Sequence, residues 1–146
     1  MKKVLVINGP NLNMLGKRDP DKYGKLTLGQ INNKLVKSAK SLGITLEYFQ
    51  SNHEGEIIDF LQKKAGKSDG VLINPGALTH YGYSLRDALE DTRLPIVEVH
   101  LSDIDKREDF RKIDVLDGVF INKIHGLKEK SYLIGLEALI KHLNSL

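Results

Sequence analysis

Near the start of the 146-residue chain, the stretch Val4-Leu5-Val6-Ile7-Asn8-Gly9-Pro10-Asn11 decides the fold. Four apolar residues in succession, followed by a turn signal, are typical of a short strand that is covered on both faces of a parallel sheet. A polar segment follows, and residues 8–26 contain three glycines and two prolines. Irregular segments of this length are usually functional or disordered. The opening of the chain therefore predicts a buried strand that leads into a long functional loop.

Strand and helix patterns alternate through the rest of the chain. Short apolar runs predict four more strands, at residues 44–49, 71–73, 96–99 and 119–124. Apolar residues at helical spacing predict helices at about 28–42, 54–65, 83–91 and 133–143, with a short helix within 103–112. Alternating units of this kind form a parallel sheet with helices on both faces. We expect a single three-layer α/β domain, residues 1–146, with the doubly wound flavodoxin-like strand order 2-1-3-4-5.

Two capping boxes indicate where helices begin. Thr27 lies three residues before Gln30, and Ser51 lies three residues before Glu54. In a capping box the hydroxyl accepts a hydrogen bond from the backbone three residues later, and the Gln or Glu side chain accepts one in return. We therefore expect a helix to start at each position.

The composition excludes several classes of protein. The chain has no cysteine, which rules out disulfides, thiolate zinc sites, iron–sulfur clusters and a cysteine nucleophile. Lys and Arg number 22 against 19 Asp and Glu, so the net charge is +3. No basic run is interleaved with aromatic residues, and we expect no nucleic-acid partner. The first apolar run is shorter than the roughly 7–15 residues of a signal peptide, and no stretch approaches the roughly 20 apolar residues of a membrane helix. We expect a cytoplasmic protein with no membrane partner.

The doubly wound architecture also predicts where a ligand binds. Ligands of such sheets bind outside the carboxyl ends of the strands, where the strand order reverses. The loops concerned begin at Asn8-Gly9-Pro10-Asn11, at Asn74-Pro75-Gly76 and at Glu98-Val99-His100-Leu101-Ser102. None of them holds a P-loop, a dinucleotide fingerprint or a nucleophile elbow. The polar side chains of these three loops are the candidates for a site.

Glu98 and His100 stand two residues apart at a predicted strand end. Alternation along a strand places both side chains on one side of the sheet. A carboxylate in this position can fix the tautomer of the imidazole, raise its pKa and keep it available as a general acid. Two other interpretations fit the same residues: a metal site with His80 as the third ligand, and a hydrogen-bonded pair without a chemical role.

Arg18 and Tyr23 share the long loop after the first strand. A tyrosine with the usual pKa of about 10 is a poor base at neutral pH. A neighbouring guanidinium, which stays charged, favours the phenolate form and would make the tyrosine a better base. The alternative is a solvated arginine beside a tyrosine that packs on the surface.

Four more polar residues could belong to the site or could be structural. Ser102 precedes the predicted short helix, where its hydroxyl and free backbone N–H groups could bind a carboxylate or simply cap the helix. Arg111 could contact an anion or be solvated. Asn11 and Asn74 could supply amide groups to a site, or could be turn residues, because asparagine is common in turns.

Taken together, these residues resemble the type II 3-dehydroquinate dehydratases. The similarity is carried by Ile7-Asn8-Gly9-Pro10-Asn11-Leu12, Leu15-Gly16, Arg18-Asp19-Pro20, Tyr23-Gly24, Asn74-Pro75-Gly76-Ala77, Thr79-His80, Leu85-Arg86-Asp87-Ala88, Glu98-Val99-His100-Leu101-Ser102, Arg107-Glu108 and Phe110-Arg111. These pieces cover most of the chain in the right order and at matching intervals, which makes the resemblance specific.

The resemblance implies a reaction and a set of catalytic roles. The family removes water from 3-dehydroquinate to give 3-dehydroshikimate, by a reversible anti elimination through an enolate, without metal, cofactor or Schiff base. By position, Tyr23 would remove the proton alpha to the ketone, and Arg18 would stabilise the developing charge. Asn11 would help to position a water that stabilises the enolate. His100, oriented by Glu98, would protonate the departing hydroxyl.

The resemblance also implies how substrate is held. Hydroxyls of the substrate would be bound by Asn74, His80, Asp87 and Arg111. Its carboxylate would be held by Leu101 and Ser102, through backbone N–H groups and the hydroxyl. The long loop after the first strand would act as a lid. Members of the family assemble as dodecamers of trimers, so a homo-oligomer is implied, and the context would be shikimate-pathway aromatic biosynthesis or quinate breakdown.

The chain departs from the family pattern near its last strand. After Arg111 the family usually has a serine three residues later, then Ser-Pro, then a glycine in the last strand. These places hold Asp114, Asp117-Gly118 and Asn122 here. None of them has a catalytic role in the resemblance, so we expect the departures to change subunit contacts rather than chemistry.

Overall fold

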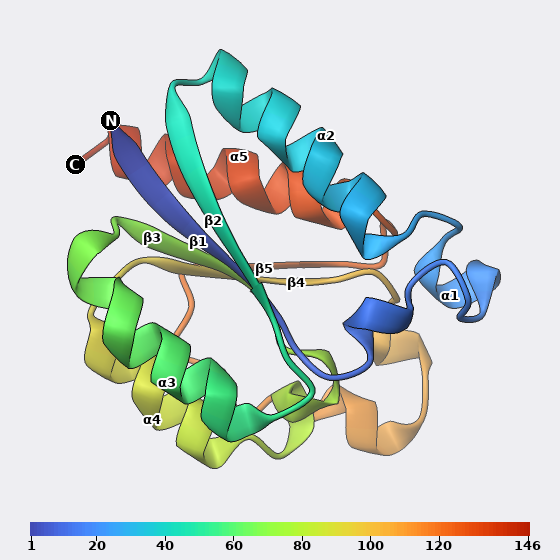
Figure 1. Ribbon diagram of the computed structural model, residues 1–146. Helices are drawn as coiled ribbons and strands as arrows, with labels where there is room; N and C mark the ends of the chain where they lie inside the picture. Colours follow the sequence, from blue (N-terminus) through green and yellow to red (C-terminus); the bar gives the residue numbers. More distant parts are fainter.

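The computed structural model describes residues 1–146 and contains one five-stranded sheet between two layers of helices (Figure 1). The strands are β1 (Lys2–Asn8), β2 (Ile44–Gln50), β3 (Gly70–Asn74), β4 (Ile96–His100) and β5 (Asn122–His125). Neighbouring strands pair in the order β2-β1-β3-β4-β5, and every pair is parallel. The predicted doubly wound order is therefore confirmed.

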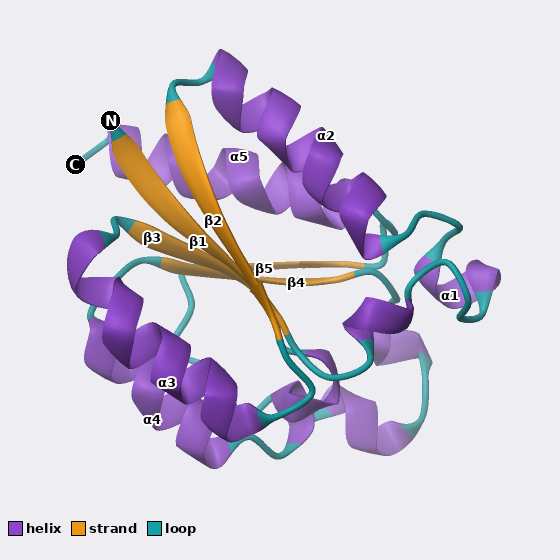
Figure 2. Ribbon diagram, in the orientation of Figure 1, coloured by secondary structure: helices purple, strands orange, loops and turns teal.

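Helices cover both faces of the sheet. The α-helices are α1 (Pro20–Tyr23), α2 (Leu28–Ser41), α3 (Glu54–Lys64), α4 (Tyr83–Thr92) and α5 (Lys130–Asn144), and short 3-10 helices are η1 (Leu12–Met14), η2 (Ala65–Lys67), η3 (Gly76–His80), η4 (Ile104–Lys106) and η5 (Asp109–Lys112). Helices α2 and α5 lie on one face, and α3 and α4 lie on the other (Figure 2). None of these helices combines the length and the apolar character that crossing a bilayer requires.

Strand β1 shows why the chain folds in three layers. Val4 and Val6 belong to the apolar cluster under α2 and α5, whereas Leu5 and Ile7 belong to the cluster under α3 and α4. All four side chains are fully buried. Burial of an aliphatic side chain contributes about 1.5–3 kcal/mol, so the four-residue run stabilises both interfaces of the central strand.

One of the two predicted capping boxes is present. Thr27 and Gln30 exchange both hydrogen bonds of the box at the start of α2. The box predicted at Ser51 is wrong, because α3 is capped by His53 and begins at Glu54. The Ser51 hydroxyl instead accepts a hydrogen bond from the backbone N–H of His53, two residues away. This local bond holds a turn and delays the start of the helix.

Two other boundaries differ from the prediction. Residues 103–112 form two separate 3-10 turns, η4 and η5, rather than one helix. Strand β5 begins at Asn122 and not at Val119, because the Val119 N–H closes a turn onto the Leu116 carbonyl. Val119 and Phe120 pack against the cluster under α3 and α4 instead. Their apolar character reflects this packing and not strand pairing.

Two glycines allow the loops after β1 and β3 to lie against each other. A Cβ atom on Gly9 would lie 2.3 Å from the Pro75 carbonyl oxygen, and a Cβ on Gly76 would lie 2.9 Å from the Pro10 carbonyl oxygen. Gly76 also has a φ of +61°, which side chains disfavour. The Gly9 N–H donates a 2.8 Å hydrogen bond to the Asn74 carbonyl. Only glycine permits this approach, which builds the floor of a pocket at the carboxyl ends of the strands.

Candidate active site

A pocket lies at the carboxyl ends of β1, β3 and β4, where the doubly wound rule predicts it. Nine of the eleven residues predicted for the site line it: Asn11, Arg18, Tyr23, Asn74, His80, His100, Leu101, Ser102 and Arg111. Of the other two, Glu98 contacts His100 from behind, and Asp87 is exposed on α4 and does not line the pocket. We call Asn11, Arg18 and Tyr23 the loop half of the pocket, and the lining residues from β3, β4 and the turns that follow them the sheet half.

The loop half is built by the segment between β1 and α2. Asp19 caps α1 by accepting a hydrogen bond from the Asp21 N–H, Pro20 occupies the first turn, and Gly24 ends the helix with a φ of +79°. This single turn of helix carries Tyr23. The Arg18 guanidinium carbon lies 3.8 Å from the centre of the Tyr23 ring. A permanent positive charge therefore lies against the face of the phenol ring.

Asn11 is held by its backbone rather than by its side chain. Its φ is +69°, in the left-handed region that asparagine tolerates better than most residues. Its backbone N–H donates a 3.0 Å hydrogen bond to the Asn52 side-chain oxygen. The Asn11 side chain forms no hydrogen bond within the protein and lines the pocket. The amide is therefore free to bind a ligand or a water.

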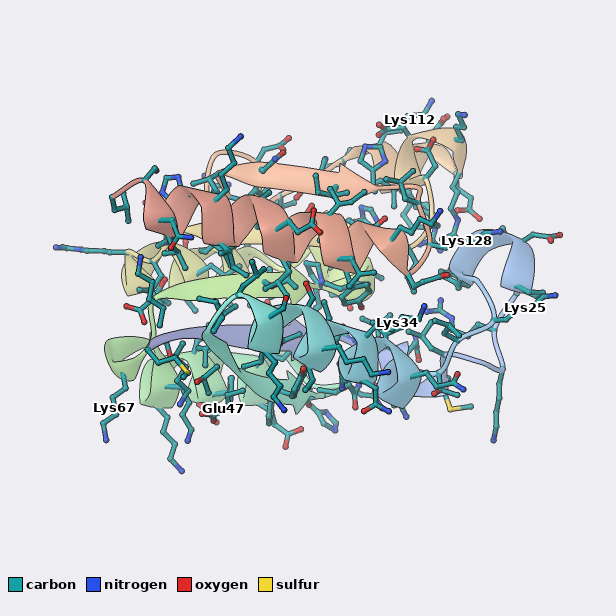
Figure 3. All side chains as sticks on the ribbon, turned by 90° about the horizontal axis from the view of Figure 1, so that it is seen from above. Lys25, Lys34, Glu47, Lys67, Lys112 and Lys128 are labelled. Carbon is teal, nitrogen blue, oxygen red and sulfur yellow. The ribbon has the colours of Figure 1, made fainter.

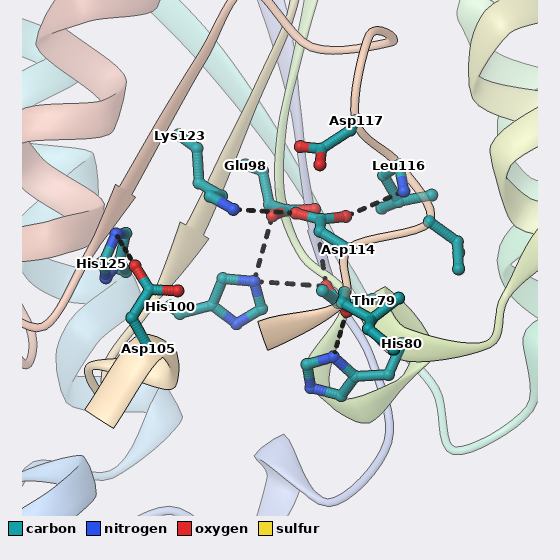
Figure 4. A network of polar contacts seen from close by, with 12 residues as sticks. Thr79, His80, Glu98, His100, Asp105, Asp114, Leu116, Asp117, Lys123 and His125 are labelled. Atoms are coloured by element: carbon teal, nitrogen blue, oxygen red, sulfur yellow. Dashed lines mark hydrogen bonds and ion pairs between the residues drawn. The ribbon is translucent and has the colours of Figure 1, made fainter. Parts of the chain in front are cut away.

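His100 is the most enclosed polar group of the sheet half. Its Nε2 lies 3.2 Å from Glu98 Oε2 and 3.2 Å from the Thr79 hydroxyl, so both partners lie behind the ring (Figure 4). The other ring nitrogen, Nδ1, points away from Glu98. Because His100 lines the pocket, Nδ1 is the nitrogen available to a ligand.

Burial reverses the expected effect on the pKa of His100. A carboxylate two residues from His100 in the sequence predicts a raised pKa, but burial lowers the pKa of His100 to about 4. Burial also raises the pKa of Glu98, which weakens its carboxylate as a counter-ion. His100 is therefore neutral at physiological pH, and an N–H on Nδ1 can donate a hydrogen bond into the pocket.

His80 faces the same pocket in a defined tautomer. Its Nδ1 lies 2.7 Å from the Ile113 carbonyl oxygen. A carbonyl oxygen only accepts hydrogen bonds, so Nδ1 carries the hydrogen and Nε2 is an acceptor. Burial lowers the pKa of His80, which keeps the ring neutral. His80 can thus accept a hydrogen bond from a ligand hydroxyl.

A buried hydrogen-bond network fixes Asn74. Its Nδ2 donates to the Tyr132 hydroxyl at 2.9 Å, and its Oδ1 accepts from the Gly76 N–H at 3.0 Å. The Tyr132 hydroxyl in turn donates to Asn8 Oδ1 at 2.5 Å, and burial raises the pKa of Tyr132. The sequence analysis assigned no role to Tyr132, because a tyrosine within an apolar helical pattern does not differ from an ordinary core residue. It nevertheless bridges the side-chain amides of Asn8 in β1 and Asn74 in β3 below the pocket.

Positive charge dominates the pocket. Three guanidinium groups line it, those of Arg18, Arg107 and Arg111, and no carboxylate does. Arg107, to which the sequence analysis gave no separate role, donates to the Ser102 hydroxyl at 3.2 Å and lies 5.3 Å from the centre of the Tyr23 ring. It therefore connects the two halves. The adjoining turn η4 is capped by Asp103 and not by Ser102, which leaves Ser102 to the pocket.

Lysines add positive charge at the end of the molecule where α1, which carries Tyr23, lies. Viewed from above, Lys25, Lys112 and Lys128 gather at the end of the molecule where α1 lies, and Lys67 lies at the other end (Figure 3). A cluster of one sign raises the local concentration of ligands of the opposite sign. The site is suited to a small anion such as a carboxylate.

The structure does not favour the metal-site interpretation. His80 directs Nδ1 at a carbonyl, and His100 directs Nε2 at Glu98 and Thr79. The ligand atoms of Glu98, His80 and His100 do not converge on one point. Asp103, Asp105 and His125 do direct their ligand atoms toward one another, but these residues do not line the pocket. The interpretation of Glu98 as the partner that orients His100 fits the geometry.

Comparison with known proteins agrees with this site. The family model described as dehydroquinase class II matches residues 2–140. The chain belongs to this family. It is 52% identical over 140 residues to the 3-dehydroquinate dehydratase of Halothermothrix orenii, covering 96% of this chain and 95% of the relative. It is 53% identical to that of Roseiflexus castenholzii, covering 94% and 88% of the two chains.

Solved structures of dehydroquinases have the same fold. The crystal structure of a type II dehydroquinase from Butyrivibrio crossotus superposes with a TM-score of 0.91 at 44% identity, covering 94% of this chain and 97% of that one. The corresponding structure from Propionibacterium acnes gives the same TM-score at 35% identity, covering 97% of each chain. Members of this dehydroquinase family thus share both the sequence pattern and the architecture.

Proposed function

We propose that this protein is a type II 3-dehydroquinate dehydratase, a hydro-lyase that converts 3-dehydroquinate into 3-dehydroshikimate. One observation carries the proposal: the arginine-backed Tyr23 and the neutral, Glu98-oriented His100 line the same cationic pocket. An elimination of water needs a base for the carbon-bound proton and an acid for the leaving hydroxyl. The names of the relatives support the same reaction.

The base acts from the loop half. Tyr23 removes the proton alpha to the ketone, and the Arg18 guanidinium stabilises the negative charge that develops on the phenol and then on the enolate. The free amide of Asn11 positions a water at the enolate oxygen. Arg107 lies near the Tyr23 ring and adds a second positive charge on this side.

The acid acts from the sheet half. His100 donates its Nδ1 hydrogen to the departing hydroxyl as the carbon–oxygen bond breaks, and Glu98 holds the ring. Substrate hydroxyls are bound by His80 Nε2, by Asn74 and by Arg111. The backbone of Leu101 and the Ser102 hydroxyl hold the carboxylate, with Arg107 behind the hydroxyl. In this mechanism no metal and no covalent imine takes part.

We also propose that the protein works as a homo-oligomer, a dodecamer built from trimers. Support comes from large apolar side chains that are exposed in the single chain, among them Tyr83 on α4 (66% exposed) and Ile113 after η5 (60% exposed). Exposed apolar surface marks protein–protein contacts where such residues are contiguous in the assembly. Asp87 is exposed on α4, so substrate binding by Asp87 would have to occur at the pocket of a second copy. Light scattering of the wild type and of Tyr83→Ser measures the assembly, and a monomeric wild type would contradict this proposal.

The test of the reaction is a continuous ultraviolet assay with 3-dehydroquinate, run with and without a chelator. The product contains a conjugated enone carboxylate and the substrate does not, so absorbance grows as water is lost. We expect growth that the chelator does not change. Incubation with substrate and borohydride should leave the enzyme active, because no lysine imine forms. Folded protein without absorbance growth would point to a non-catalytic module that binds small anions, and loss of activity with the chelator would point to a metal-dependent lyase.

A further inference from the structure

Behind His100, and outside the pocket, lies a cluster of ionisable groups that the mechanism has not yet used. The carboxyl groups of Glu98 and Asp114 face each other within hydrogen-bonding reach (Figure 4). Lys123 Nζ lies 3.2 Å from Asp114 Oδ2, and the Leu116 N–H donates to Asp114 Oδ1 at 2.8 Å. A series of side-chain contacts therefore runs from Lys123 through Asp114 and Glu98 to His100 Nε2.

Both carboxyl groups are removed from water. The side chains of Glu98 and Asp114 are 0% and 1% exposed, respectively. A carboxylate can only accept hydrogen bonds, so two carboxyl groups that bond to each other must hold a proton between them. A second negative charge in a buried pair is also strongly unfavourable. The pair therefore carries one proton and one negative charge, and the Lys123 ammonium balances that charge.

The titration behaviour of the cluster agrees with a shared proton. Burial, together with the hydrogen bond and the charge of Glu98, raises the pKa of Asp114 to about 7. Burial alone would lower the pKa of Lys123, but the Asp114 and Glu98 carboxylates reverse this and raise it. These groups titrate as a unit, so the values belong to the pair rather than to one residue.

The surroundings of the pair contain few other charges. The ionisable groups that face it are His80 of η3, His100 of β4, Lys123 and His125 of β5, and Asp117 of the loop that carries Asp114. Asp117 is exposed and makes no side-chain hydrogen bond to the pair. Lys123 is thus the cation in direct contact with Asp114, and its charge also acts on Glu98.

We propose that Asp114, held in place by Lys123, is a positioning residue that keeps a proton on the Glu98–Asp114 pair for delivery to His100. This inference rests on the proposed function. As the carbon–oxygen bond of the substrate breaks, its electron pair stays on the leaving oxygen, which takes the Nδ1 hydrogen. Nε2 then takes the proton of the pair from Glu98. A neutral histidine can therefore act as an acid without becoming an imidazolate. After the product leaves, Nδ1 takes a proton from water in the pocket, and Nε2 returns its proton to the pair.

The residue that makes this pair possible is one of the departures noted in the sequence. Asp114 stands where the family usually has a serine, and the sequence analysis expected such departures to affect subunit contacts. The structure instead places its carboxyl group against Glu98. We infer that this protein has a carboxyl group, that of Asp114, behind the general acid His100 at a position where the family usually has a serine.

The pH dependence of kcat and KM for 3-dehydroquinate tests the inference in three variants. In Asp114→Asn a single carboxyl group beside Lys123 loses its proton more easily, so the fall of kcat at high pH should move down by about one pH unit or more. At pH 8 we expect kcat to fall by about tenfold, with KM nearly unchanged. Lys123→Gln removes the cation that favours ionisation, so the same fall should move up. Asp117→Asn, three residues from Asp114, removes a charge that acts on Glu98 only at a distance, so it should move the profile down by much less than Asp114→Asn does.

A second measurement does not depend on turnover. Infrared spectra between pH 5 and pH 9 should show the carbonyl band of a buried protonated carboxyl in the wild type and in Asp117→Asn. The band should be absent near neutral pH from Asp114→Asn and from Glu98→Gln, because the remaining carboxylate is paired with Lys123.

The outcomes separate the two proposals. Opposite shifts in Asp114→Asn and Lys123→Gln, together with the band, support the inference, because a merely structural role would not move the profile in opposite directions. Turnover without the band, or shifts in one direction only, would overturn the inference and leave the proposed function intact. A band without any turnover of 3-dehydroquinate would overturn the proposed function and with it the role of the pair. If Asp114→Asn does not fold, the direction of the Lys123→Gln shift and the wild-type band decide the question.

Discussion

The two halves of the pocket differ in how firmly the fold holds them. In the sheet half, His100 and Asn74 are buried and each has at least two hydrogen-bond partners below the pocket. In the loop half, Arg18 and Tyr23 are half-buried, and their side chains form no hydrogen bond with the rest of the chain. Tyr23 packs against the apolar cluster under α2 and α5, and the Arg18 guanidinium stacks on its ring.

An elimination needs an acid and a base, and the two halves of the pocket supply one each. The acid is positioned by the folding of the sheet, and its neutral state results from the same burial that stabilises the domain. The base is carried on a segment with few tertiary contacts, so its position can respond to substrate. Disturbing the loop half should therefore alter turnover with little effect on stability, whereas disturbing the sheet half should alter both.

The largest effect is expected for Tyr23→Phe. Only the group that accepts the proton is removed, so kcat should fall by about 10²–10⁴-fold. The ring and its stacking with Arg18 remain, so the affinity for product and the free energy of unfolding should stay near the wild-type values. Steady-state kinetics, calorimetric titration with product and urea unfolding measure the three quantities. Tyr81→Phe, an exposed tyrosine outside the pocket, is the matched control. Near-normal turnover of Tyr23→Phe would show that another group is the base.

Gly9→Ala should disturb the floor of the sheet half. The new methyl would meet the Pro75 carbonyl oxygen at 2.3 Å, and backbone cannot yield as a flexible side chain does. We expect a loss of about 1–3 kcal/mol in the free energy of unfolding and a parallel loss of turnover, because the loops after β1 and β3 must separate. Gly55→Ala in α3 is the control: it has nothing within 4 Å of its Cβ and should stabilise the protein by about 0.5–1 kcal/mol. If the two variants were equally stable, the close approach of Gly9 to the Pro75 carbonyl would not be what requires glycine at position 9.

The burial of neutral His100 should make stability depend on pH. Its pKa is about 4 in the folded protein and about 6.5 in an unfolded chain, so the unfolded state binds more protons in this window. Stability from this group is present above pH 6.5 and lost as the pH falls toward 4, by about 1–3 kcal/mol. Urea unfolding at several pH values should show a smaller loss in His100→Asn than in the wild type. His142→Asn, which lies outside the pocket, should keep the wild-type dependence, and identical slopes in all three proteins would contradict the prediction.

The smallest effect is expected for the lysines at the end of the molecule where α1 lies. Lys25→Gln combined with Lys128→Gln should raise KM for the anionic substrate by less than about threefold at low ionic strength. The increase should vanish at 1 M salt, where the screening length falls to about 3 Å. Lys67→Gln, at the opposite end of the molecule, is the control (Figure 3). A rise in KM that persists at high salt would indicate direct contact rather than attraction at a distance.

Much of the fold could be predicted because its signals are local. The continuous apolar run of β1 and the alternation of strands and helices lead to the observed strand order. The convergence of nine predicted residues on one pocket follows from that order, because the carboxyl ends of adjacent parallel strands meet. The capping box predicted at Ser51 was wrong because the Ser51 hydroxyl bonds within its own turn, which the spacing to Glu54 does not reveal.

The features that the sequence did not reveal all depend on contacts between distant residues. Asp114 lies 16 residues from Glu98 in the chain, and the facing of their carboxyl groups depends on the path of an irregular loop. The pKa of His100 was predicted in the wrong direction, because adjacency to a carboxylate is visible in the sequence and the depth of burial is not. Arg107 was assigned no separate role, since its contact with Ser102 requires the turn of η4.

The hydrogen bonds of Tyr132 have a consequence for the order of events during synthesis. Tyr132 lies 124 residues after Asn8 and belongs to the last helix, α5. Until that helix has left the ribosome, the buried side-chain amides of Asn8 and Asn74 lack the hydroxyl that bridges them, and only backbone hydrogen bonds hold the strand ends below the pocket. A nascent chain that already contains every residue of the pocket is therefore still without a finished one, and catalytic competence arises only when nearly the whole polypeptide has been released.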